Sequence, residues 1–119
     1  MPFTWREYLD LAKALPTQCQ HVSSLEATER CSVSRAYYAA FCHARNYARV
    51  HLGFVPTNSG SDHRLVRQFY VRRGMPDIAQ RLASMHQWRK LCDYNDIVPN
   101  TTAMFTNAMR EAEYVIRQL

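Results

Sequence analysis

Hydrophobic and polar residues recur along this chain with the period of three to four residues that amphipathic helices show. No run alternates apolar and polar residues with the β-branched enrichment of strands, and the chain has only 3 glycines. The pattern therefore predicts an all-α fold, a four- to five-helix up-down bundle formed by one domain over residues 1–119.

Helix-capping signals predict where the first two helices begin and end. Thr4 and Glu7 have the spacing of a capping box, which predicts a helix over residues 4–15 that Pro16 terminates. Ser23 and Glu26 repeat the same spacing, and nothing breaks the helical pattern after them before Gly53. The second helix is therefore predicted to be long, at about 28 residues.

Three further helices follow from the second half of the chain. Asp62 is predicted to cap a short arginine-rich helix that stops at Gly74. Pro76 suits the first position of the next helix, which is expected to end near Asp93. The apolar residues of segment 101–119 recur on one face, which predicts a last amphipathic helix there.

The long second helix has two distinct faces. At 100 degrees per residue one face is apolar and is predicted to be core, and it consists of Val33, Tyr37, Ala40, Phe41, Ala44 and Ala48. The roughly opposite face mixes an aromatic ring with arginines, and it consists of Arg35, Tyr38, Cys42, Arg45 and Arg49. We therefore expect adjacent tyrosines to differ in role, with Tyr37 in the core and Tyr38 beside the arginines, where its ring can stack on a base or fill a dimer contact.

Arg89 projects from the middle of the apolar face of the fourth helix. A charge at such a position is unfavourable unless it is paired, and Asp93 lies one turn later, at i+4. An Arg89–Asp93 bridge has two interpretations. It either stabilises the bundle alone or, beside Tyr94, presents a fork that binds an anion.

The composition limits the classes of function. The net charge is +5, and the basic residues are 13 arginines against 2 lysines, a bias that favours an anionic partner or buried ion pairs. The 4 cysteines occur singly, and no His lies three or four residues from another His or Cys, so we expect neither disulfides, nor a metal, nor a cofactor. No apolar run approaches the roughly 20 residues of a membrane span, and the charged N-terminus is unlike a signal peptide. We therefore expect a cytoplasmic protein with no membrane association.

Three segments together resemble the HEPN domain, a small helical domain of prokaryotes and higher eukaryotes. They are SRAYYAAFCHARNYARVHLGF, SDHRLV and RKLCDYND, followed by the terminal amphipathic helix. The resemblance implies a bundle that dimerises around a cleft lined by both copies. Many members are metal-independent ribonucleases, often toxins paired with an antitoxin, whereas others are noncatalytic modules that bind RNA or associate with nucleotides.

The resemblance implies that catalytic HEPN members carry a motif of an arginine, a following polar residue and a histidine four to six positions after the arginine. This chain departs from that motif. By position Arg89 matches the motif arginine, but the slot of the motif histidine holds Asp93 and Tyr94, so the version here is degenerate. A tyrosine is a poor general base at neutral pH. The catalytic residues are therefore unknown, with Arg89, Tyr94 and His63 as candidates. Two other arginine–histidine pairs have the spacing of the motif. Arg81 and His86 lie too early in the fourth helix, and Arg45 and His51 lie in the wrong helix.

The sequence thus predicts an HEPN-like dimer that binds RNA or a nucleotide, as a component of a toxin–antitoxin pair or beside a nucleotidyltransferase partner. Its binding cleft is expected to consist of Arg35, Tyr38, Arg89, Asp93 and Tyr94. One alternative is an RNA endonuclease toxin that retains activity through His43, His63 or His86. Another is a noncatalytic protein-interaction module in which the Arg89–Asp93 pair only stabilises the bundle.

Overall fold

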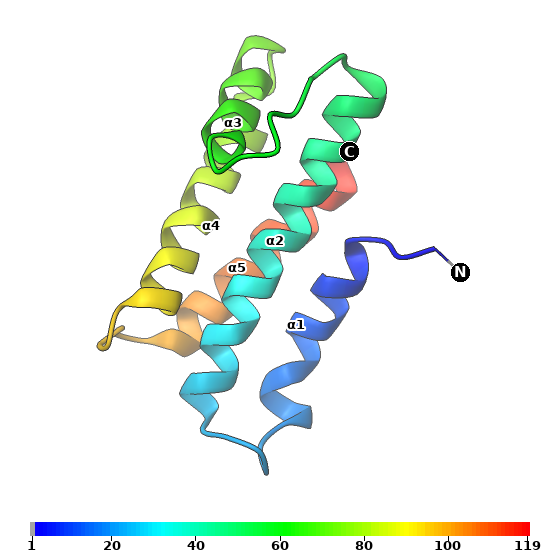
Figure 1. Cartoon of the computed structure of the whole chain (residues 1–119). Coiled ribbons are helices and arrows are strands. Elements are labelled where there is room, and N and C mark those ends of the chain that lie inside the picture. The colour runs from blue at the N-terminus through cyan, green and yellow to red at the C-terminus, as the bar shows by residue number, and fades with distance from the viewer. Residues whose placement is uncertain (1) are drawn as a thin grey trace.

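The fold of residues 2–119, which this computed structural model describes, consists of five α-helices without a strand (Figure 1). The helices are α1 (Arg6–Gln18), α2 (Leu25–His51), α3 (Asp62–Arg72), α4 (Pro76–Tyr94) and α5 (Thr101–Gln118). The predicted all-α helical bundle is confirmed.

Helix α2 occupies the centre of the bundle. Figure 1 shows α1 on one side of α2, α3 and α4 on the other side, and α5 behind it. Helix α3 packs mainly against α4, with which it forms a helical hairpin. The remaining helices thus surround α2, and its long apolar stripe becomes the main core of the molecule.

The predicted core face of α2 is buried as expected. Tyr37, Ala40, Ala44 and Ala48 are inaccessible to solvent, and Val33 and Phe41 nearly so. Burial extends further round the helix than the sequence predicted, however, because Ala36 and Ala39 are also inaccessible. Cys42, expected on the arginine-bearing face, is likewise buried, and it lines a hollow together with the loop that precedes α3.

Helix α1 continues through Pro16, which was predicted to follow its end. The helix reaches Gln18, with Pro16 buried in its last turn. A proline in the last turn removes only one backbone donor, and the hydroxyl of Thr17 donates to the carbonyl of Ala14 at 3.1 Å. The backbone N–H of Cys19 also donates to Leu15 at 3.1 Å, so the turn remains closed.

Helix α2 is capped one residue later than predicted. Its N-cap is Ser24, which has an extended backbone and whose hydroxyl accepts from the N–H of Ala27 at 3.1 Å. Glu26, which was predicted to form a capping box with Ser23, forms an ion pair with Arg30 at 3.0 Å instead. Neighbouring serines are equivalent as caps in sequence, so only the backbone conformation distinguishes them.

Asp62 does not cap α3 in the predicted way. It is the first residue of the helix, and its carboxylate accepts hydrogen bonds from the preceding loop. The donors are the N–H of Thr57 at 2.9 Å, the hydroxyl of Thr57 at 2.6 Å and the N–H of Asn58 at 3.0 Å. The buried carboxylate thus fixes loop 54–61 against the start of α3.

The turn between α3 and α4 is a Schellman motif. Gly74 adopts a φ of 76°, its N–H donates to Val71 at 3.1 Å, and the N–H of Met75 donates to Tyr70 at 2.9 Å. Pro76 then begins α4, as predicted. This turn sets the antiparallel arrangement of α3 and α4.

Replacing Gly74 with Ala should destabilise the fold by about 1 kcal/mol, because a Cβ disfavours the left-handed conformation. The measurement is urea-induced unfolding followed by circular dichroism. Gly60→Ala is the matched control, because Gly60 lacks a left-handed φ and an added Cβ there has no atom within 4 Å. Equal midpoints for Gly74→Ala and the parent would contradict the turn described.

Candidate functional site

Tyr38 lies between arginines that come from two different helices. The guanidinium carbon of Arg35, one turn earlier on α2, is 5.5 Å from the centroid of the Tyr38 ring, and that of Arg89 on α4 is 5.2 Å from it. A nitrogen of Arg89, Nη2, also donates to the Tyr38 hydroxyl at 2.5 Å. The structure thus brings together three of the five residues that the sequence predicted to share one cleft.

Arg89 is paired with an acidic residue, as its position on the apolar face of α4 requires. Its Nε lies 3.1 Å from Oδ2 of Asp93, although the N–H is not directed at that oxygen as in a hydrogen bond. The same Oδ2 accepts from the hydroxyl of Ser34 at 3.1 Å. The predicted Arg89–Asp93 bridge therefore exists and ties α4 to α2.

Tyr94 is the most exposed of the predicted cleft residues. It ends α4 with 72% of its surface accessible, and its ring centroid is 5.6 Å from the guanidinium of Arg89. The chain after it is held by Arg30, which donates to the carbonyls of Asn95 at 2.5 Å and Asp96 at 3.0 Å. Tyr94 is thus an exposed ring at a fixed end of α4.

Cavities lie on both sides of Tyr38. One has a volume of about 320 Å³ and is lined by Trp5, Tyr8, Arg35 and Tyr38. The other has a volume of about 440 Å³, and its lining includes Tyr38, Phe41, Arg45, Ser59 and His63. The predicted single cleft is therefore a pair of hollows that share the Tyr38 ring, and the linings of these hollows do not include Arg89, Asp93 or Tyr94.

Arg35 and Arg45 have no acidic partner within residues 2–119. Arg35 lies 5.5 Å from the ring centroids of both Tyr8 and Tyr38, and its Nη2 donates to the Ser34 hydroxyl at 3.3 Å. Arg45 donates to the side-chain oxygen of Asn46 at 3.1 Å. Arg35 is thus the one charged residue in the lining of its hollow, whereas Arg45 shares its hollow with the buried carboxylate of Asp62.

A stack of histidines lies behind the hollows, and sequence reasoning did not anticipate it. The rings of His63 on α3 and His86 on α4 are parallel within 5°, with centroids 4.8 Å apart. Nδ1 of His63 lies 2.5 Å from the hydroxyl of Tyr37, and Nδ1 of His86 lies 3.2 Å from Nη1 of Arg67. The hydroxyl of buried Tyr37 therefore has His63 as its hydrogen-bond partner.

The proton positions in this stack follow from its neighbours. Because a guanidinium can only donate, Nδ1 of His86 must accept from Arg67. Burial, followed by the charges of nearby residues, lowers the pKa of His86 to about 4, and burial with Arg89 and Arg67 lowers the pKa of His63. Burial raises the pKa of the Tyr37 phenol, so a neutral phenol and a neutral His63 share one hydrogen bond whose direction is set by the tautomer of His63.

The other histidines considered in the sequence lie outside this site. His43 has a buried Nε2 without a hydrogen-bond partner within residues 2–119, and burial and then Arg6 lower its pKa. Arg81 is paired with Glu111 and does not contact His86. His51 is exposed against Tyr47 and does not contact Arg45. These arginine–histidine pairs therefore form no joint site.

No family model, curated protein or solved structure matches this chain. Among residues 2–119 no three His, Cys, Asp or Glu side chains are grouped so that they could hold a metal ion. No helix in that part of the chain combines the length and the apolar character needed to cross a bilayer.

The histidine stack should make stability depend on pH. Because the pKa of His86 in the fold is about 4 and the ordinary value is 6.5, the unfolded chain takes up the proton first on acidification. The free energy of unfolding should therefore fall from about pH 6.5 to about pH 4. In His86→Gln this fall should be smaller by about 1 kcal/mol, since partial solvent exposure screens the effect.

Urea unfolding at a series of pH values measures this difference. The control is His21→Gln, because His21 is exposed on the connection between α1 and α2. That variant should keep the full acid dependence of the parent. An identical pH profile for His86→Gln and the parent would show that His86 is not held in its neutral form.

Proposed function

We propose that this chain is an HEPN-like protein that binds single-stranded RNA or a nucleotide through the surface around Tyr38. The observation that carries the proposal is the hollow that contains Arg35, because its lining consists of a guanidinium and three aromatic rings and includes no carboxylate. Aromatic rings stack on bases, and arginines grip phosphates, so the combination suits a single strand.

The Arg89–Asp93 pair supports this surface indirectly. It holds the Tyr38 hydroxyl through Arg89 and connects to α2 through Ser34, so it fixes the ring between the hollows. Since the charge of Arg89 is balanced by Asp93 and Arg45 shares its hollow with Asp62, Arg35 is the stronger phosphate ligand. This assignment combines both interpretations of the bridge, as a structural pair that supports a binding surface.

Removing Arg35 should weaken RNA binding without unfolding the protein. The Arg35→Ala variant should bind a labelled single-stranded RNA less tightly, and the slope of log affinity against log salt should decrease by about 0.7 per lost phosphate contact. Fluorescence anisotropy over a salt series measures the slope. The control is Arg110→Ala, because Arg110 is exposed on α5, remote in sequence from the hollows and absent from their linings.

Failure of the parent to bind RNA or a nucleotide at low salt would contradict the proposal. Loss of the fold in Arg35→Ala, seen as loss of helical circular dichroism, would make Arg35 structural instead. Arg89→Ala is less diagnostic, because it leaves Asp93 unpaired and disturbs the interior of α4.

A metal-independent ribonuclease is the second candidate function. His63 lines the same hollow as Tyr38, and its lowered pKa leaves it neutral and able to accept a proton. Its Nδ1 is engaged by Tyr37, so we expect the RNA to remain intact. The ribonuclease would be favoured over a binding protein if the parent cleaved RNA in the presence of a chelator and the His63→Gln variant did not.

We further propose that the protein is a homodimer whose copies meet near Tyr94. Tyr94, whose ring lies beside Arg89, and Ile97, which follows three residues later and is 86% accessible, both expose apolar surface. A second copy that covers this surface would bring the two Tyr38 surfaces together. An antitoxin or a nucleotidyltransferase as a further partner remains a prediction from the resemblance, and the cytoplasm as the location remains a prediction from the composition.

Light scattering should give twice the chain mass of 13.9 kDa at micromolar concentration. The Ile97→Asp variant should shift the mass toward that of one chain, because a charge there opposes burial. Val50→Asp, at a comparably exposed apolar residue near the end of α2, is the control and should stay dimeric. A parent with the mass of one chain would exclude the dimer.

A further inference from the structure

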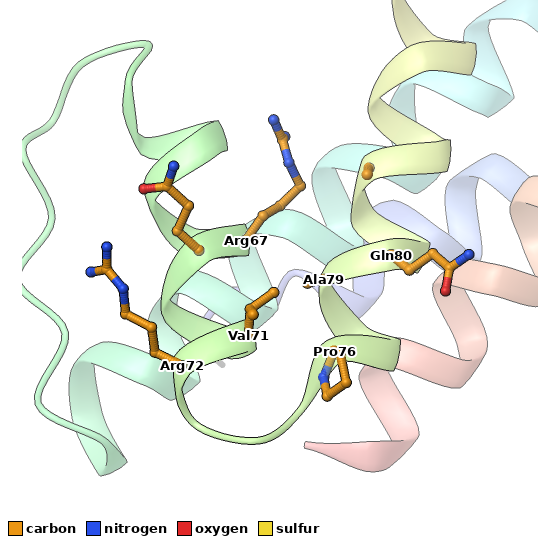
Figure 2. A pocket seen from close by; sticks show the side chains of 8 residues that line it. Arg67, Val71, Arg72, Pro76, Ala79 and Gln80 are labelled. Carbon is orange, nitrogen blue, oxygen red and sulfur yellow. The ribbon is translucent and has the colours of Figure 1, made fainter.

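A second surface with both apolar and cationic residues lies between α3 and α4, away from the linings of the Tyr38 hollows. It is an open groove with a volume of about 460 Å³ (Figure 2). The groove has an aliphatic floor, formed by Val71, Pro76, Ala79 and Ala83. Its rim is polar, formed by Arg67, Gln68, Arg72 and Gln80.

The floor consists of short side chains and is accessible except at Ala79, which is buried. Val71 is 54% exposed although it is aliphatic, and Figure 2 shows it pointing from α3 toward α4. On α4 the groove residues Pro76, Ala79 and Ala83 recur at helical spacing along one face. Short side chains along a groove between helices leave room for another helix to approach closely.

The rim carries positive charge that the fold does not neutralise. Helix α3 and its C-cap carry four arginines, which are Arg64, Arg67, Arg72 and Arg73. None of them forms an ion pair within residues 2–119. Arg67 contacts only the ring nitrogen of His86 among described polar partners, and Arg73 lies over the ring of Phe69. The acidic residue at the start of α4, Asp77, is engaged by the hydroxyl of Tyr114 at 2.7 Å.

We propose that this groove docks an amphipathic, acidic helix of a partner protein. The apolar stripe of such a helix would cover Val71 and the short side chains of α4, while its carboxylates would meet the arginines of α3. An RNA strand fits less well, because the groove lining includes no aromatic ring on which bases could stack. The proposal stands independently of RNA binding at Tyr38.

The experiment measures the binding of synthetic helical peptides by fluorescence anisotropy. The probe is a peptide with leucines at helical spacing on one face and glutamates on the other, and the control peptide carries lysines in place of the glutamates. The parent should bind the acidic peptide at least about tenfold more tightly than the basic one. Equal binding of the two peptides, or no binding of the acidic one, would overturn the proposal.

Variants in the groove locate the binding site. Val71→Asp places a charge on the floor, and Arg72→Glu reverses a charge on the rim. Each variant should bind the acidic peptide about tenfold more weakly than the parent does. The matched controls are Val50→Asp and Arg49→Glu, which make the same changes at exposed positions near the end of α2. Circular dichroism should show equal helicity in all four variants. Equal weakening by the control pair would mean that net charge alone drives binding, which would overturn the proposal.

The RNA assay separates this groove from the Tyr38 surface. Val71→Asp and Arg72→Glu should bind single-stranded RNA as the parent does, whereas Arg35→Ala should retain peptide binding. If the groove variants no longer bound RNA but still bound the acidic peptide, the groove would belong to the RNA-binding surface and the proposal would be wrong. If instead they changed the mass of the protein in light scattering, the occupant would be a second copy of this chain.

Discussion

The close approach of the other helices to α2 is the constraint on which the rest of the structure depends. Ala36, Ala39, Ala40, Ala44 and Ala48 are inaccessible to solvent, and such short side chains allow neighbouring helices to pack tightly. The large rings of α2 cannot use these contacts. Tyr37 and Phe41 therefore meet α3, where each packs against His63, and Tyr38 remains at the edge of the packed region. The position of the candidate site is thus a consequence of where alanine gives way to aromatic residues.

Local signals in the sequence predicted the features that depend on local structure. The period of apolar residues gave the helices, and the i+4 spacing of Arg89 and Asp93 predicted their bridge, because both follow from helix geometry. The stack of His63 on His86 was not predicted, since it depends on how the α3–α4 hairpin closes. The one available signal was that His86 lies three residues before Arg89 and so shares its side of α4. The buried position of Cys42 likewise depends on a loop whose path a helical period does not specify.

Charge is distributed unevenly over the molecule. Glu113 on α5 accepts from Arg6 and Lys13, and these hydrogen bonds lower its pKa to about 2, while Arg81 is paired with Glu111. Cations packed against α5 are therefore largely balanced. Those of α3 and the outer edge of α2 are not, so the net charge of +5 is concentrated where the aromatic hollows and the aliphatic groove lie. An uneven field of this kind increases the rate at which an anionic partner meets that side.

Arg67 stands at the junction of these surfaces. It lines the groove between α3 and α4, and it donates to His86, which stacks on His63, whose Nδ1 is hydrogen-bonded to Tyr37. A carboxylate in the groove can bind the N–H groups of Arg67 that His86 leaves free, because a guanidinium has five N–H donors and Nη1 is the atom that contacts His86. The hydrogen bond to His86 can therefore persist when the groove is occupied. One side chain thus serves both the groove and the histidine stack, and it connects the docking surface of α3 with the wall behind Tyr38.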